Sequence, residues 1–150
     1  MSGEIGHTRV QGESLLCRCG KRGCLETVVS STVVVDRMRE AGIRPVDRAF
    51  PLADVQPSTA LSTMVTDVGR TLGRVLADLC NWINPAAIIL GGALGTAGDP
   101  LVDGVRESIN RYAHAGAAEA LEIRKTQLGL RSELLGAIAV ACQQAAYQPA

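Results

Sequence analysis

Three cysteines within eight residues, Cys17, Cys19 and Cys24, constrain the fold of this chain more than any other feature of its sequence. His7 stands ten positions before the first of them, so the pattern reads His-x9-Cys-x-Cys-Gly-x-x-Gly-Cys. Three thiols and one imidazole supply the four nitrogen and sulfur ligands of a closed, tetrahedral zinc site. The pattern therefore predicts a loop that folds back on itself around a structural metal ion.

Two other interpretations of the cysteines stay open at this point. The thiols can be ordinary reduced cysteines, or Cys17 or Cys19 can form a disulfide with Cys24, although nothing in the sequence indicates an oxidising compartment. Gly20 and Gly23 favour the metal interpretation, because a loop that turns three sulfurs toward one point needs backbone conformations with positive φ. The remaining cysteines, Cys80 and Cys142, fall in apolar helical patterns, and we expect both to be small core residues.

Composition narrows the classes of protein to which the chain can belong. Of its 150 residues, 47% are hydrophobic, which is enough for a real core, and the formal net charge is zero. A free-standing nucleic-acid-binding domain normally carries a basic excess, and aromatic residues at 3% argue against stacking on single strands. The apolar runs are far shorter than the roughly 18 residues of a membrane span, and residues 1–10 do not resemble a signal peptide. We therefore expect a cytoplasmic protein without membrane contact.

The hydrophobic pattern predicts an α/β protein with a parallel sheet. Residues 1–24 are loop-like and rich in glycine, and the prolines in 43–57 indicate a second loop. Ser58 is the expected cap of a long helix whose apolar stripe we expect to pack against the sheet, and Asp99 is the expected cap of a later one. The predicted helices span 25–40 with a break at 30–32, 58–84, 100–113 and 133–147, and the predicted strands span 86–90 and 121–127.

Three segments resemble the ROK family of repressors, open reading frames and sugar kinases. The first runs from Gly3-Glu4-Ile5-Gly6-His7 to Cys17-Arg18-Cys19-Gly20-Lys21-Arg22-Gly23-Cys24-Leu25-Glu26. The second, Asn81 to Gly92, resembles the family's second glycine motif, and the third, Leu134-Leu135-Gly136-Ala137, resembles its C-terminal helix. The likeness covers almost the whole chain, and its cysteine signature is the specific part.

The resemblance implies the ribonuclease-H-like, actin-like ATPase fold of two lobes, of which this chain matches the C-terminal lobe with an inserted zinc loop. We expect residues 1–26 to form the zinc and sugar loop and residues 27–150 the α/β lobe. The phosphate loop, the catalytic-base aspartate and any helix-turn-helix that the family carries upstream have no counterpart here. The chain is therefore expected to be the C-terminal part of a longer protein, with no catalysis on its own.

The resemblance also implies the site residues. His7, Cys17, Cys19 and Cys24 are expected to bind structural Zn²⁺, and Glu4, His7 and Glu26 to face a sugar. Alternatively, Glu4 is a solvated loop residue and Glu26 only helps the next helix to begin. Gly91 and Gly92 are expected near the adenosine of ATP, unless they serve only to end a strand.

Three functions follow from the resemblance as hypotheses. The first is the sugar-sensing half of a transcriptional regulator that contacts DNA only through a missing N-terminal domain; the stretch Arg131-Ser132-Glu133 favours it. The second is the C-terminal half of an ATP-dependent sugar kinase, resembling glucokinase, and only this one needs ATP. The third is a degenerate, zinc-stabilised fragment without a ligand. For the first two we expect a small-molecule sugar as ligand and a homo-oligomer.

Overall fold

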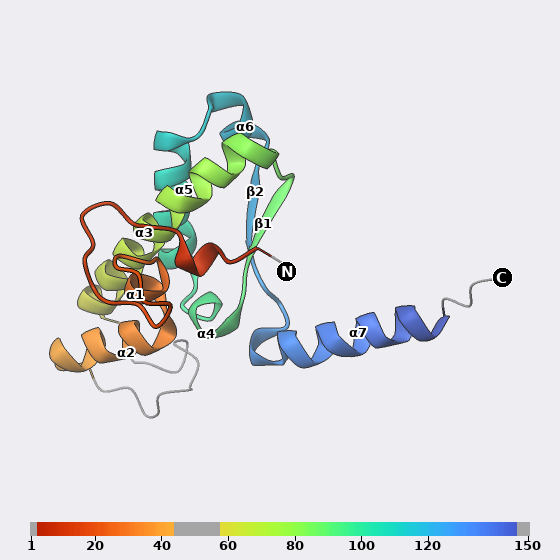
Figure 1. Ribbon diagram of the computed structural model, residues 1–150, viewed down its shortest axis with the longest axis horizontal. Helices are drawn as coiled ribbons and strands as arrows, with labels where there is room; N and C mark the ends of the chain where they lie inside the picture. Colours follow the sequence, from red (N-terminus) through yellow and green to blue (C-terminus); the bar gives the residue numbers. More distant parts are fainter. Residues whose placement is uncertain (1–2, 44–57, 147–150) are drawn as a thin grey trace.

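The computed structural model describes residues 3–43 and 58–146 of the chain (Figure 1). The predicted order of helix, strand, helix, strand and helix is confirmed, with several short elements added to it. In chain order the elements are η1 (Ile5–His7), α1 (Glu26–Val29), α2 (Ser31–Glu40), α3 (Thr59–Ile83), β1 (Ala87–Leu90), α4 (Gly92–Gly95), α5 (Asp99–Tyr112), α6 (Ala115–Ala120), β2 (Glu122–Lys125), η3 (Gly129–Arg131) and α7 (Ser132–Ala146).

Local signals set most of the helix boundaries. Ser30 separates α1 from α2, and its hydroxyl accepts a hydrogen bond from the Val33 amide. The Ser58 hydroxyl accepts a hydrogen bond from the Leu61 amide at 3.1 Å, as the position of Ser58 before the apolar stripe predicts. Asp99 does not cap α5, because it is already part of that helix. Its carboxylate instead accepts a hydrogen bond from Lys125 Nζ at 2.7 Å, as one half of an ion pair. The loop predicted over 43–57 lies almost wholly outside the described residues.

The sheet is a parallel pair of strands, β1 and β2, with Ala87 opposite Glu122 and Leu90 opposite Lys125. A parallel pair needs a crossover connection, which α4, α5 and α6 supply. The predicted α/β class with a parallel sheet is therefore confirmed. The short helices α4 and α6 were not predicted, because six residues or fewer give no helical period to recognise.

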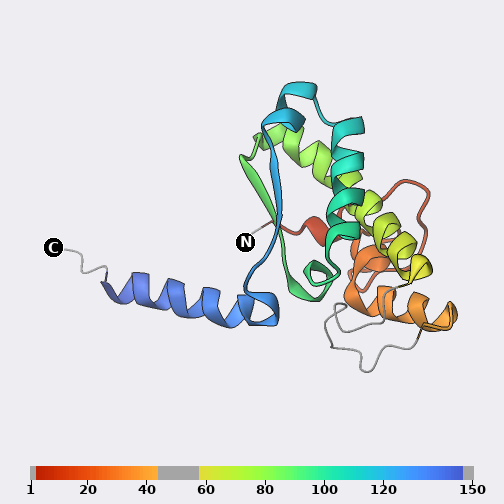
Figure 2. The same cartoon turned by 180° about the vertical axis from the view of Figure 1, so that it is seen from behind.

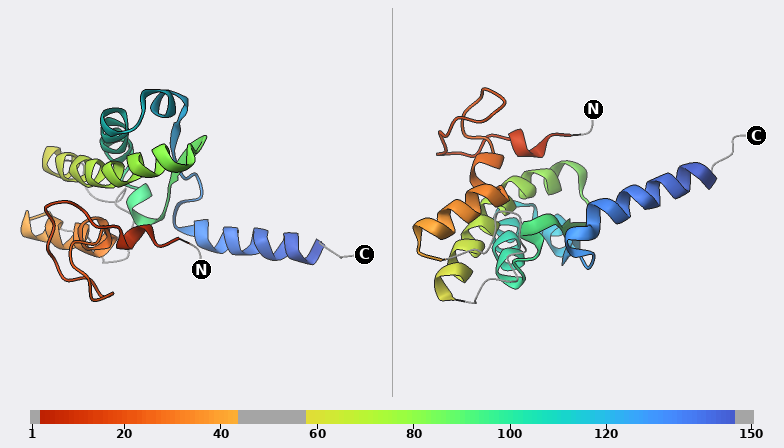
Figure 3. Two further views of the ribbon diagram at one scale, coloured as in Figure 1. Left: turned by 45° about the horizontal axis from the view of Figure 1, so that its top comes forward. Right: turned by 90° about the horizontal axis from the view of Figure 1, so that it is seen from below.

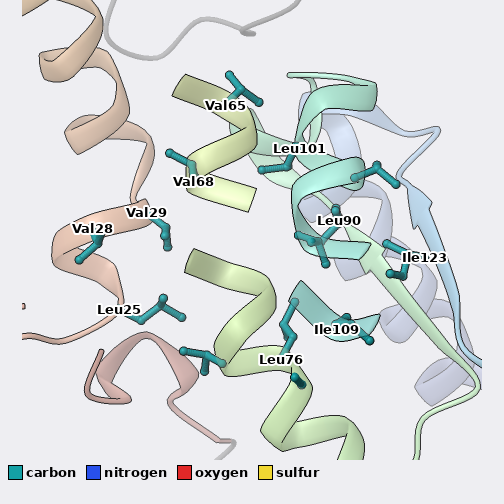
Figure 4. Packing of buried hydrophobic residues seen from close by; sticks show 14 of the residues in the cluster. Leu25, Val28, Val29, Val65, Val68, Leu76, Leu90, Leu101, Ile109 and Ile123 are labelled. Carbon is teal, nitrogen blue, oxygen red and sulfur yellow. The ribbon is translucent and has the colours of Figure 1, made fainter. Parts of the chain in front are cut away.

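The core is layered, with α5 between the sheet and α3, and with α1 and α2 on the other side of α3 (Figure 4). The expectation that α3 packs mainly against the sheet is wrong, because α5 is its chief neighbour. Members of the core in these layers are Leu25 at the N-cap of α1, Val28 of α1, Val65, Val68 and Leu76 of α3, Leu101 and Ile109 of α5, Leu90 of β1 and Ile123 of β2.

Two expectations about buried residues fail, one at the end of α3 and one within α7. Trp82 and Ile83 continue the apolar stripe of α3, yet the Trp82 side chain is 82% exposed. Cys142 is also exposed, whereas Cys80 is buried as expected. Cys142 belongs to α7, which has no buried residue and projects away from the rest of the molecule in every view (Figures 2 and 3).

Candidate metal centre and ligand site

The structure brings the four expected metal ligands together in one cluster. The ligand atoms of His7, Cys17, Cys19 and Cys24 all lie within 4.8 Å of one another. His7 comes from η1, and the cysteines come from the loop that leads into α1. Cys17 and Cys24 are buried, so the loop encloses the cluster on one side.

Backbone hydrogen bonds hold this loop in place. The amide of Cys17 donates to the Lys21 carbonyl at 2.7 Å, and the amide of Gly20 donates back to the Cys17 carbonyl at 2.9 Å, which closes a tight turn around Cys19. Gly20 and Gly23 have φ of +84° and +72°, as predicted. Gly23 also has no room for a side chain, because a Cβ there would collide with the Glu13 carbonyl.

Two of the distances between donor atoms match those of a tetrahedral zinc site. With Zn–S bonds of about 2.3 Å, ligand atoms at the corners of a tetrahedron lie about 3.7 Å apart. The Cys19 and Cys24 Sγ atoms are 3.6 Å apart, and Cys17 Sγ is 3.6 Å from His7 Nδ1. Three thiols and one imidazole also suit Zn²⁺ better than Mg²⁺ or Ca²⁺, which prefer oxygen ligands. The cluster could therefore bind a metal ion through His7 Nδ1 and the three thiolates.

Glu26 lies directly beside this cluster. Its Oε1 accepts a hydrogen bond from the Cys17 thiol at 2.9 Å, and Arg18 stands 3.7 Å from its Oε2. The shared hydrogen bond raises the pKa of Cys17 to about 12 and lowers the pKa of Glu26. η1 packs against the same side chain, since a Cβ on Gly6 would lie 3.6 Å from Glu26 Cβ. The Glu26 side chain remains 25% exposed, so a ligand can still reach it.

The other expected sugar-site residue is less constrained. Glu4 is exposed, and its carbonyl accepts the amide of His7 at 3.0 Å while its side chain makes no cap bond. A surface pocket of about 400 Å³ opens beside the cluster, and its walls include His7 and Cys24. Arg9, Lys21 and Arg22 complete that pocket, and the sequence pattern alone did not single them out.

Gly91 and Gly92 lie at the carboxyl end of β1, where ligands of parallel α/β sheets usually bind. Gly92 has φ of +68°, so its conformation alone favours glycine. Gly91 has φ of −122°, and a Cβ there would lie 3.9 Å from Thr126 Cγ2, which is an ordinary contact. Its lack of a side chain is therefore not explained by strain or crowding within the described residues.

A second surface pocket, of about 390 Å³, lies at the same end of the sheet. Thr126 and Lys125 are among its walls, as is Asp99 of α5. These residues carry no motif, so only the rule that sites form at the carboxyl ends of parallel strands could have indicated them. The pocket does not include the Cys/His cluster, so the two candidate sites are separate surfaces of this chain.

The fold and the candidate site define the class: an α/β protein with a parallel sheet and a loop whose Cys/His cluster could bind a metal ion. Comparison with known proteins identifies the family. The family model described as "ROK family" matches residues 1–144. The chain belongs to the ROK family. The actin-like ATPase fold that the resemblance implied is confirmed, as its structural neighbours are ROK kinases and a ROK regulator.

Curated relatives include both enzymes and repressors. The chain is 34% identical to a glucokinase of Halalkalibacterium halodurans over 91% of its own length and 46% of that protein. It is 32% identical to the DNA-binding transcriptional repressor Mlc of Escherichia coli over 91% of this chain and 36% of that one. It thus spans about half the length, or less, of the curated relatives that it matches.

Solved structures divide in the same way. A ROK family glucokinase from Streptomyces griseus, in complex with glucose and AMPPNP, superposes with a TM-score of 0.75 at 27% identity, over 95% of this chain and 52% of the enzyme. A ROK family transcriptional regulator, a homologue of the E. coli Mlc protein, gives a TM-score of 0.71 at 25% identity, over 83% of this chain and 34% of that one.

Among the helices of residues 3–43 and 58–146, none is long and apolar enough to cross a membrane.

Proposed function

We propose that this chain is the sugar-sensing half of a ROK-family transcriptional regulator, stabilised by a structural zinc ion at His7, Cys17, Cys19 and Cys24. The observation that carries the proposal is the position of Glu26, whose Oε1 lies 2.9 Å from Cys17 Sγ, directly beside the Cys/His cluster. The loop that encloses the metal ion therefore also positions the carboxylate that meets the sugar.

The chemistry of these side chains suits a sugar. A carboxylate only accepts hydrogen bonds and can take them from two neighbouring hydroxyl groups, a role we assign to Glu26 and Glu4. When Nδ1 of His7 binds a metal ion, its other ring nitrogen is fixed as an N–H donor, which suits a hydroxyl oxygen. The zinc ion itself is structural in this proposal and takes no part in a reaction.

In the regulator, DNA is bound by a separate N-terminal domain, and sugar binding by this half changes the affinity of that domain. Relatedness to the Mlc repressor supports this role, as does the sequence Arg131-Ser132-Glu133 after the second strand. We further propose that the regulator is a cytoplasmic homo-oligomer. The ligand in this proposal is a small-molecule sugar.

The second candidate function is the C-terminal half of an ATP-dependent sugar kinase. Relatedness to glucokinases supports it, and so does Gly91, which is exposed and has no conformational need for glycine. In this case Gly91 and Gly92 let the nucleotide approach the backbone at the carboxyl end of β1, beside the pocket that Thr126 lines. ATP is a ligand only in this second function.

The genomic sequence upstream of Met1 separates the two functions. A helix-turn-helix region encoded there supports the regulator, and a phosphate-binding loop supports the kinase. In solution, a panel of sugars is added to the natural polypeptide that carries these residues. Release of operator DNA supports the regulator, and formation of sugar phosphate supports the kinase.

Glu26→Gln tests the sugar site itself. In the natural polypeptide that carries these residues, we expect this variant to bind the responding sugar about tenfold more weakly, because a charged acceptor is replaced by a neutral amide. Glu13→Gln, in the same loop, is the matched control and should bind sugar like the wild type. Isothermal titration with glucose, xylose and N-acetylglucosamine measures both, and equal affinities of Glu26→Gln and wild type for the responding sugar would refute the assignment.

A further inference from the structure

Three cationic side chains gather in the pocket that opens beside the Cys/His cluster. The walls of this pocket, which we call the basic pocket, are His7, Arg9, Lys21, Arg22 and Cys24. Within the described part of the chain, no Asp or Glu is among them. The pocket at the end of the sheet differs in this respect, because an aspartate is part of its walls. A hollow lined by charges of one sign concentrates the electric field and attracts a ligand of the opposite sign.

The backbone fixes the positions of both arginines in the basic pocket. Arg9 lies opposite Cys24 in an antiparallel bridge, and Arg22 lies opposite Leu16 in a second one. The guanidinium of Arg22 is also anchored, since its Nη1 donates a hydrogen bond to the Ser14 carbonyl at 3.1 Å. Both positions are therefore set before a ligand arrives, which lowers the entropic cost of binding.

No carboxylate neutralises these cations. In residues 3–43 and 58–146, none of the three forms an ion pair. Other arginines do: Arg18, in the same loop, stands 3.7 Å from Glu26. Arg70 of α3 pairs with Asp67 at 2.7 Å and with Glu107 at 2.9 Å. Without such a partner the three cations of the basic pocket repel one another, and a bound anion would remove that repulsion.

We propose that the basic pocket binds the phosphate group of a small molecule. A guanidinium matches a phosphate through two parallel hydrogen bonds, and a lysine ammonium adds a point charge. A zinc ion in the adjacent cluster would not prevent this, because Zn²⁺ with three thiolates carries one net negative charge against three positive ones. The volume of the pocket, about 400 Å³, lies within the range of roughly 300–1,000 Å³ that is usual for small-molecule sites. The pocket therefore has room for more than the phosphate itself.

Duplex DNA fits the basic pocket less well. DNA presents a row of phosphates, and proteins meet it with a basic stripe or an overall basic excess. Here the cations converge on one hollow, and the formal net charge of the chain is zero. A single phosphate group, as the free ion or as the ester of a sugar, is therefore the ligand that we assign to the pocket. The same three cations recognise both forms.

Isothermal titration tests the proposal on the natural polypeptide that carries these residues. Inorganic phosphate and glucose 6-phosphate are titrated separately at constant ionic strength, since salt weakens nonspecific attraction between charges. At least one of them should bind saturably, and Arg9→Gln should weaken that binding about tenfold, as expected for the loss of one charge-assisted hydrogen bond. Tighter binding of glucose 6-phosphate identifies a sugar phosphate as the ligand, and equal binding identifies the free ion. No saturable binding of either compound would overturn the proposal.

Matched variants locate the phosphate site. Arg18→Gln removes the same charge from the same loop but outside the basic pocket, and it should bind phosphate like the wild type. Lys21→Gln is a second loss of charge in the pocket, for use if zinc content and melting temperature show that Arg9→Gln is misfolded. Equal affinities of the pocket variants and Arg18→Gln overturn the proposal, as does an Arg9→Gln variant that loses affinity for duplex DNA but not for phosphate. Glu26→Gln should bind inorganic phosphate normally, so this test stands apart from the sugar hypothesis.

Discussion

At the residue scale, single side chains determine the shape of the metal loop, the segment from His7 to Cys24 that carries the Cys/His cluster. The loop is held by a few backbone hydrogen bonds and buries few side chains, among them Cys17 and Cys24. A bound ion would therefore supply a large part of the folding free energy of the loop. Glu26 depends on the same loop, because it follows Cys24 by two residues and its Oε1 lies 2.9 Å from Cys17 Sγ. Loss of a bound metal ion should therefore disturb the proposed sugar site, although in this proposal the ion does not contact the sugar.

The first residue-scale prediction is that the protein contains about one zinc ion per chain. Cys19→Ser removes one of four ligands, so we expect less bound zinc and a lower melting temperature. Cys142→Ser is the control, because this exposed cysteine lies in α7 and outside the cluster. Metal analysis and thermal melting of protein purified without added zinc measure the effect. A metal-free wild type that melts at the same temperature as the zinc-loaded protein would contradict it.

At the scale of elements, glycines determine how closely α3 and α5 approach. A Cβ on Gly73 would lie 2.6 Å from the Val105 carbonyl oxygen, and one on Gly69 would lie 2.5 Å from the Leu101 carbonyl oxygen. These contacts are with backbone atoms, which cannot rotate away as a side chain can. The two helices therefore sit closer together than any pair with larger residues at these positions could.

Gly73→Ala tests this close approach. The added methyl group forces α3 and α5 apart, and we expect a loss of roughly 1–3 kcal/mol in the free energy of unfolding. Gly136→Ala is the matched control, since nothing lies within 4 Å of a Cβ there. That variant should be neutral or stabilise the helix by up to about 1 kcal/mol. Urea denaturation compares them, and similar effects of the two substitutions would show that the crossing is not tight.

A second element-scale prediction separates the covered helix from the uncovered one. Leu101 of α5 is almost completely buried, so Leu101→Ala should cost about 2–5 kcal/mol in the free energy of unfolding. Leu134→Ala, on exposed α7, should cost less than about 0.5 kcal/mol in the chain alone. Denaturant titration of both variants provides the measurement. A large loss at Leu134 would mean that α7 is packed in solution, contrary to the structure.

At the scale of the whole molecule, the pocket beside the Cys/His cluster and the pocket at the end of the sheet share no residue. Phosphoryl transfer requires nucleotide and acceptor to be held together in one geometry, and the chain spans about half the length of the glucokinases that it matches. We therefore expect the 150-residue chain by itself to phosphorylate no sugar, whatever the activity of a longer form. A coupled assay with ATP and glucose checks this, with the H. halodurans glucokinase as positive control. Turnover above background would disprove the expectation.

The sequence by itself determined the elements whose signals are local. The period of apolar residues identified α3 and its cap at Ser58, and the apolar run before Gly91 identified β1. The spacing of cysteines and glycines identified the metal cluster, because ligands held by one short loop must come close together. Pattern and structure agree at these places since neighbours in the chain are also neighbours in space.

Only the tertiary structure decided which apolar surfaces are covered. Trp82 and Cys142 continue apolar helical patterns, yet both are exposed, because a pattern shows that a face is apolar without showing what packs on it. The pairing of Asp99 with Lys125 joins residues 26 positions apart in place of the expected helix cap. The contact of Glu26 with Cys17 arises from the way the metal loop folds back onto the start of α1. Each of these outcomes depends on which segments the fold brings together, and the order of residues does not display that.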